Sequence, residues 1–95
     1  MYLQKRGHYY VYMVQCANGI YYTGATKDLD NRIKLHNSGH GAKYLKGKGP
    51  VRLVYSKEYK YYNNVLHAER NLKKLTREQK ENLIRNYENA KTPHP

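Results

Sequence analysis

The sequence predicts a small α+β domain with the element order ββαβαα, in which helices flank a three-stranded antiparallel sheet. A Tyr- and Val-rich run before Asn18-Gly19 and the returning run Ile20 to Gly24 after it are typical of a β-hairpin, and helix-capping patterns begin at Asp28 and at Thr76. Because the chain has only 95 residues, we expect a single domain over residues 1–95, with an ordered core from about residue 8 to about residue 90.

The first half of the chain is expected to supply a hairpin and one helix. Residues 8–16 and 20–24 form its strands, after a polar, basic leader over residues 1–7. Asp28 caps the helix, which ends at Asn37-Ser38-Gly39. The apolar face of this helix carries Leu29, Ile33 and His36.

The second half is expected to supply an irregular loop, one strand and two helices. Residues 39–50 are rich in Gly and Lys and form the loop, and residues 51–55, extending toward 59, form the strand. Either Asn63 or Asn64 caps the second helix, and Thr76 with Gln79 forms a capping box for the third. Their apolar faces are Val65, Ala68, Leu72 and Leu75 in the second helix and Leu83, Ile84 and Tyr87 in the third.

Positive charge is concentrated in the middle of the chain, whose formal net charge is +11. No acidic residue falls within residues 31–57. Such a stretch attracts phosphate polyanions, whereas a solvated basic surface without a specific partner is the alternative. The basic residues of this stretch are Arg32, Lys34, Lys43, Lys46, Lys48, Arg52 and Lys57.

Cysteine content and hydropathy indicate the compartment. The single cysteine, Cys16, cannot form an internal disulfide, so nothing points to an oxidising compartment. No apolar stretch is long enough for a signal peptide or a transmembrane span. We therefore expect a cytoplasmic protein with no membrane partner.

Three groups of side chains could carry chemistry. Tyr12 and Tyr22 lie on adjacent strands, and a phenol becomes a useful base only if cations or a metal favour the phenolate. The alternative is an aromatic pair that stabilises the hairpin. Arg32 and His36 are one helical turn apart, so a guanidinium suited to phosphate lies beside a proton-transferring imidazole. The alternative is a surface arginine and a histidine that favours the helix dipole.

Glu69 lies beside the inward stripe of the second helix, where a carboxylate needs a cation. A divalent metal held by this one carboxylate, waters and substrate oxygens would serve, and an ordinary ion pair with Arg70 or Lys73 is the alternative. The 39–50 loop is interpreted as a basic flap that grips a nucleic-acid backbone, with Lys43 and Tyr44 among its contacts.

Taken in order, these residues resemble the signature of the GIY-YIG nucleases, in particular their small stand-alone bacterial and archaeal members. Tyr10-Val11-Tyr12 resembles the first signature tripeptide, and Tyr22-Thr23-Gly24 resembles the second. Arg32, His36 and Glu69 fall where members carry the arginine, a frequent histidine and the metal-binding glutamate. Val11 and Thr23 replace isoleucines of the family pattern, at strand positions where a β-branched exchange is tolerated.

The resemblance implies a metal-dependent endonuclease with one Mg²⁺ or Mn²⁺ ion held by Glu69. It implies that Tyr12, or else Tyr22, deprotonates the attacking water, and that Arg32 stabilises charge on the phosphate. His36 would orient a reactant or assist proton movement. The expected outcome is hydrolysis of a phosphodiester bond.

The expected substrate is DNA. It could be structured or damaged DNA that arises in repair or recombination, and RNA is not excluded. Relatives usually work within a larger protein or with a partner, which implies a protein partner that supplies specificity. A non-catalytic nucleic-acid-binding protein and a nuclease subunit active only with a partner are the alternatives. The expected nucleic-acid-binding residues are Lys27, Lys43, Tyr44, Lys46 and Lys48.

Overall fold

The computed structural model describes residues 6–40 and 49–91. The strands are β1 (Arg6–Cys16), β2 (Tyr21–Thr26) and β3 (Val51–Tyr61), and the helices are α1 (Leu29–Asn37), α2 (Tyr62–Lys74) and α3 (Arg77–Lys91). The strands form one antiparallel sheet in the order β2-β1-β3. The predicted α+β class and the ββαβαα order are therefore confirmed.

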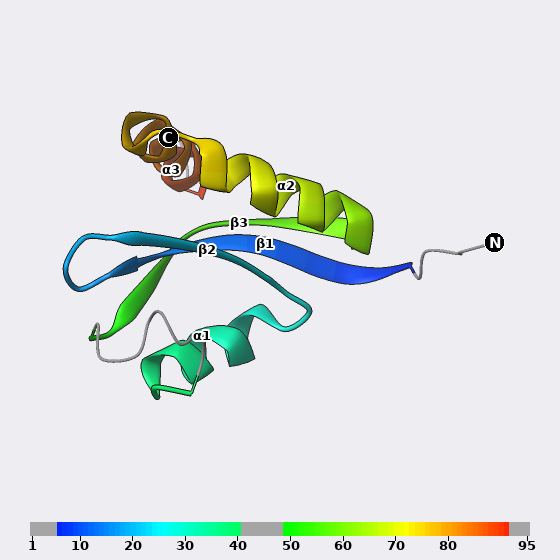
Figure 1. Ribbon diagram of the computed structural model, residues 1–95, viewed down its shortest axis with the longest axis horizontal. Coiled ribbons are helices and arrows are strands. Elements are labelled where there is room, and N and C mark those ends of the chain that lie inside the picture. Colours follow the sequence, from blue (N-terminus) through cyan, green and yellow to red (C-terminus); the bar gives the residue numbers. More distant parts are fainter. Residues whose placement is uncertain (1–5, 41–48, 92–95) are drawn as a thin grey trace.

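Helices cover both faces of this sheet: α1 lies on one face, and α2 and α3 lie on the other (Figure 1). The central strand β1 is buried on both sides because its side chains alternate between the two layers. Tyr9, Val11 and Met13 pack with α2 and α3, in a cluster completed by Val54, Val65, Leu72 and Ile84. Tyr12, Val14 and Cys16 pack with Val51 and, from α1, with Leu29 and Ile33.

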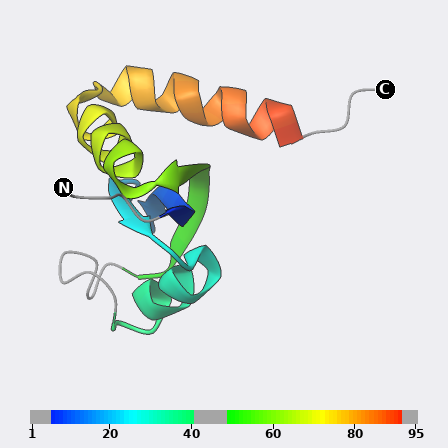
Figure 2. The same cartoon turned by 90° about the vertical axis from the view of Figure 1, so that its right-hand side faces the viewer.

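Helix α3 runs across the direction of α2, since it is seen end-on in Figure 1 and side-on in Figure 2. Side-chain contacts at both ends help to attach it to the sheet. Near its start, the Arg77 guanidinium lies 4.8 Å from the centre of the Tyr21 ring and donates to the carbonyl of Gly19 at 3.1 Å. Further along, the hydroxyls of Tyr87 and Ser56 are hydrogen-bonded at 3.0 Å. Together these contacts tie α3 to the hairpin and to β3.

Two of the predicted helix starts are confirmed. The Asp28 carboxylate accepts a hydrogen bond from the backbone N–H of Asn31 at 3.1 Å and so caps α1. Thr76 and Gln79 form the reciprocal capping box, because Gln79 accepts from the N–H of Thr76 at 2.9 Å and Thr76 accepts from the N–H of Gln79 at 3.2 Å.

The predicted cap of the second helix is wrong. Strand β3 continues to Tyr61 because it pairs with β1 along its whole length, and α2 follows without a loop. Asn63 and Asn64 therefore lie inside the helix, and Tyr61 occupies the cap position without a side-chain hydrogen bond.

The strand bounds also differ from those predicted. Strand β1 begins at Arg6, within the predicted leader, and β2 runs over Tyr21–Thr26. Within the described residues, no helix is long and apolar enough to cross a membrane.

Candidate active site

The candidate site is centred on Tyr12, which lies on the central strand and is 1% exposed. In the β1–β2 ladder, Tyr12 stands opposite Gly24. A Cβ atom at residue 24 would lie 2.5 Å from the Tyr12 hydroxyl oxygen, a distance that the two atoms could not tolerate. Gly24 is thus required so that the Tyr12 side chain can cross β2. The sequence showed this glycine only as part of a tripeptide, without its role.

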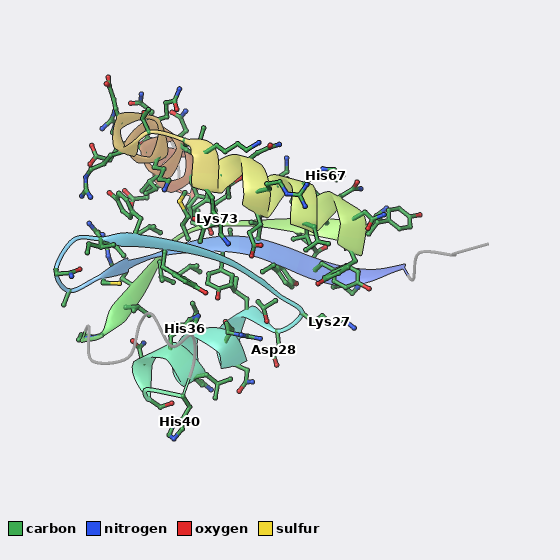
Figure 3. All side chains as sticks on the ribbon, viewed as in Figure 1. Lys27, Asp28, His36, His40, His67 and Lys73 are labelled. Atoms are coloured by element: carbon green, nitrogen blue, oxygen red, sulfur yellow. The ribbon has the colours of Figure 1, made fainter. Side chains whose placement is uncertain are left out.

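His36 enters the site from α1, on the same side of the sheet. It is 3% exposed and projects from α1 toward the sheet, whereas His40 points away from it (Figure 3). The next residue, Asn37, fastens this end of α1 to the start of β3. Its Oδ1 accepts from the N–H of Val51 at 2.6 Å, and its Nδ2 donates to the Val51 carbonyl at 3.3 Å. The sequence indicated Asn37 only as part of a helix stop.

Tyr12 and Tyr22 both meet the His36 ring. The Tyr12 hydroxyl lies 2.7 Å from His36 Nε2 in a buried hydrogen bond. The Tyr22 ring, diagonally across the ladder, contacts the imidazole edge-on, with ring centres 5.7 Å apart. The two tyrosines therefore do not simply pair with each other across the hairpin, since a buried imidazole joins them.

Burial holds both members of the hydrogen bond in their neutral forms near pH 7. Removal from water raises the pKa of Tyr12 well above its usual 10.0; the neighbouring Tyr22 and Glu69 raise it further, and Arg32 opposes the shift. Burial also lowers the pKa of His36 below 6.5, and Arg32 adds to this effect. Desolvation outweighs the opposing effect of Arg32 on Tyr12, so the free protein favours the phenol over the phenolate.

Arg32 and Glu69 approach the two tyrosines from different helices. Arg32, on α1, lowers the pKa of Tyr22, which is raised first by burial and then by Glu69 on α2. Both charges also act on Tyr12. Because electrostatic effects of this kind weaken with distance, the fold has brought a cation from α1 and an anion from α2 near the same two tyrosines.

The Glu69 carboxylate is half-buried and lies 3.8 Å from the Lys73 ammonium, so the ion pair considered from the sequence is present. Among residues 6–40 and 49–91, no three His, Cys, Asp or Glu side chains gather closely enough to hold a metal ion. One carboxylate is a poor donor set for zinc, which favours four protein ligands of nitrogen or sulfur. It fits Mg²⁺ or Mn²⁺, since a hard cation can keep several waters beside a single carboxylate.

Of the expected nucleic-acid contacts, Lys27 lies within the part of the chain that the structure describes. The Lys27 ammonium lies 5.5 Å from the centre of the Tyr9 ring, which belongs to the face covered by α2 and α3. Figure 3 shows Lys27 projecting from the end of β2. The remaining expected contacts, Lys43, Tyr44, Lys46 and Lys48, lie outside the described residues.

Comparison with known proteins gives a consistent family match. Residues 8–82 match the GIY-YIG catalytic domain. The chain is 44% identical to the UPF0213 protein BH0048 of Halalkalibacterium halodurans, over 81% of this chain and 82% of the relative. It is 38% identical to the UPF0213 protein YazA of Bacillus subtilis, over 94% of this chain and 89% of the relative. These names describe no activity or substrate.

Two solution NMR structures are also similar. The structure of BH0048 aligns with a TM-score of 0.54 at 44% identity, covering 81% of this chain and 82% of the other. The structure of EF2693 from E. faecalis aligns with a TM-score of 0.61 at 32% identity, covering 98% of this chain and 99% of the other. The fold is thus that of small proteins of nearly the same length.

Proposed function

This chain belongs to the GIY-YIG catalytic domain family, an endonuclease family, and on that premise we propose that it hydrolyses phosphodiester bonds in DNA with the help of a divalent metal ion. The observation that carries the proposal is the buried hydrogen bond between Tyr12 and His36. A phenol held against a neutral imidazole in a region of positive charge suits deprotonation of a water beside a phosphate.

Tyr12 acts as the base by passing on its own proton. In the tautomer that carries its proton on Nδ1, His36 accepts the Tyr12 hydroxyl proton at Nε2. As that proton moves to Nε2, the Tyr12 oxygen takes a proton from water, and the hydroxide formed attacks phosphorus. The P–O bond to the leaving oxygen then breaks. This transfer needs no phenolate in the resting protein, which agrees with the raised pKa of Tyr12.

Arg32, Glu69 and Tyr22 complete the site. The Arg32 guanidinium can bridge two oxygens of the phosphate and stabilise the charge that develops there. Glu69 holds the Mg²⁺ or Mn²⁺ ion, which when bound supplies positive charge at the leaving oxygen. Tyr22 supports the His36 ring through its edge contact.

The Glu69–Lys73 ion pair favours a second candidate, a nucleic-acid-binding protein without catalysis. Lys73 supplies a cation to Glu69 without a metal, and a chain of net charge +11 attracts DNA whether or not it cuts. An accessory protein that supplies specificity, and RNA as the substrate, are further variants of the first proposal.

Cleavage assays separate the two candidates. We expect the wild-type protein to cut at least one of a panel of duplex, flap and junction DNAs in Mg²⁺ or Mn²⁺, and none in EDTA. Arg32→Ala should cut about 10²-fold more slowly or worse, and Arg70→Ala, an exposed arginine of α2, should cut like the wild type. Binding without cutting across the panel, tested also with RNA forms, would favour the second candidate.

A further inference from the structure

A hollow of about 370 Å³ opens at the β2 edge of the sheet, and its lining comes from three elements. Tyr21, Tyr22 and Thr23 belong to β2, Lys73 belongs to α2 and Lys80 belongs to α3. We propose that this hollow binds a backbone phosphate of the DNA strand, next to the phosphate that is cut. The inference rests on the proposed function, and it assigns strand binding to lysines outside the 39–50 loop.

The hollow adjoins the candidate active site at Tyr22, which lines the hollow and also contacts a residue of the site. One side of this residue faces the hollow, and its ring contacts His36 edge-on. Strand β2 is at the edge of the sheet, so a long polymer can pass along it without entering the protein. A strand whose reacting phosphate lies between Tyr12 and Arg32 would therefore carry a neighbouring phosphate past Tyr22 toward the lysines.

The charge of the hollow suits a phosphate. Lys80 forms no ion pair with any residue that the structure describes. Lys73 is 57% exposed and lies 3.8 Å from the Glu69 carboxylate, which is longer than a charge-assisted hydrogen bond. Both ammonium groups can therefore turn toward a phosphate at small cost, since exposed ion pairs of this kind contribute little to stability.

The neighbouring Arg77 makes the aromatic wall rigid. Its guanidinium lies over the Tyr21 ring at 4.8 Å, donates to the Gly19 carbonyl and pairs with Glu81 at 3.0 Å. Because these contacts engage Nε and Nη2 and hold the guanidinium against the Tyr21 ring, we assign Arg77 the role of positioning Tyr21. The hollow thus combines a fixed aromatic wall with two adaptable cations, a combination that suits a nucleic-acid backbone.

Salt-dependent binding tests the proposal without relying on cleavage. Fluorescence anisotropy would follow labelled single-stranded and duplex DNA binding to the full chain in EDTA, over a series of KCl concentrations. For Lys73→Gln combined with Lys80→Gln, one phosphate is no longer neutralised, so the slope of log Kobs against log salt should become less steep by about 0.7 for single strands and about 0.9 for duplex. Lys80→Gln alone, which leaves the Glu69 contact intact, should give about half of this change.

The matched control is Lys74→Gln combined with Lys91→Gln, which removes the same charge from the same two helices outside the hollow. We expect its slope to stay near that of the wild type. An equal change in both double variants, with unchanged circular dichroism, would overturn the proposal. If both double variants change the salt slope equally while the wild type still cuts DNA, the phosphate site is rejected and the proposed nuclease function stands. If only Lys73→Gln combined with Lys80→Gln changes the slope but no DNA is cut, the phosphate site stands and the nuclease function is rejected.

Discussion

The Tyr12 hydroxyl oxygen lies 2.7 Å from Nε2 of His36, and both side chains are almost completely buried. This relationship joins the central strand to α1 on one face of the sheet. Burial raises the pKa of Tyr12 and lowers that of His36, so it favours the neutral form of both partners. A buried neutral pair of this kind can transfer a proton internally once a substrate supplies a water to the phenol.

Removing the Tyr12 hydroxyl should disable catalysis more than removing that of Tyr22. Tyr12→Phe deletes both the acceptor for the water proton and the donor to His36, so we expect the single-turnover rate to fall about 10²–10⁴-fold. It should also destabilise the fold by about 1–3 kcal/mol, because His36 loses its buried hydrogen-bond partner.

Tyr22→Phe is the control for this comparison, since it makes the same chemical change on the same face and keeps the ring against His36. Its rate should stay within about tenfold of the wild type. A larger loss in Tyr22→Phe than in Tyr12→Phe would assign the base to Tyr22 instead.

The pH dependence should report the neutral pair. His36 accepts a proton only when it is neutral, and burial holds its pKa below 6.5, so protonation stops the reaction only on the acid side of that value. The pKa of Tyr12 lies above 10.0, so Tyr12 keeps its proton throughout the neutral range. The single-turnover rate in Mg²⁺ should therefore rise with pH below about 6.5 and stay level from about 7 to about 9. A tenfold rise per pH unit across that interval would instead indicate that a phenolate is the base.

A methyl group at residue 24 should displace the Tyr12 hydroxyl. In Gly24→Ala the new Cβ would lie 2.5 Å from that oxygen, and the buried ring has little room to move. We expect about 1–3 kcal/mol of destabilisation in chemical unfolding, together with a lower cleavage rate. Gly7→Ala is the control on β1, because its Cβ would meet the Tyr9 side chain at 3.3 Å and would require only a slight adjustment. Equal rates in Gly24→Ala and the wild type would show that the position of the Tyr12 hydroxyl is not critical.

Local hydrogen bonds explain why much of the fold could be predicted. The Asp28 cap and the Thr76–Gln79 capping box each involve residues three apart in the chain, so the pattern contains the whole interaction. The cap predicted at Asn63 or Asn64 failed because strand pairing extends β3 to Tyr61, a non-local effect. The family resemblance identifies which residues form the candidate site. The short turn between their strands predicts that Tyr12 and Tyr22 lie close together.

The properties of the site depend on packing between distant segments. The burial of His36, its contact with Tyr12 and the attachment of Asn37 to Val51 arise only when α1 covers the sheet. Burial also raises the pKa of Tyr12. Lys73 and Lys80 belong to different helices and meet only because α3 crosses α2 beside β2. These contacts join separate elements, so no local sequence pattern predicts them.

The central claim is that this chain cuts DNA with a divalent ion held by Glu69, and Glu69→Gln tests it most directly. Single-turnover cleavage in Mg²⁺ and anisotropy binding should be measured with the same labelled DNA, using Glu78→Gln, an exposed residue of α3, as the control. Glu69→Gln should slow cleavage by about 10²-fold or more while binding stays close to that of the wild type, because the carboxylate serves the metal and not the DNA backbone. Cleavage by Glu69→Gln at the wild-type rate, or equal binding with no cleavage by either protein, would contradict the claim.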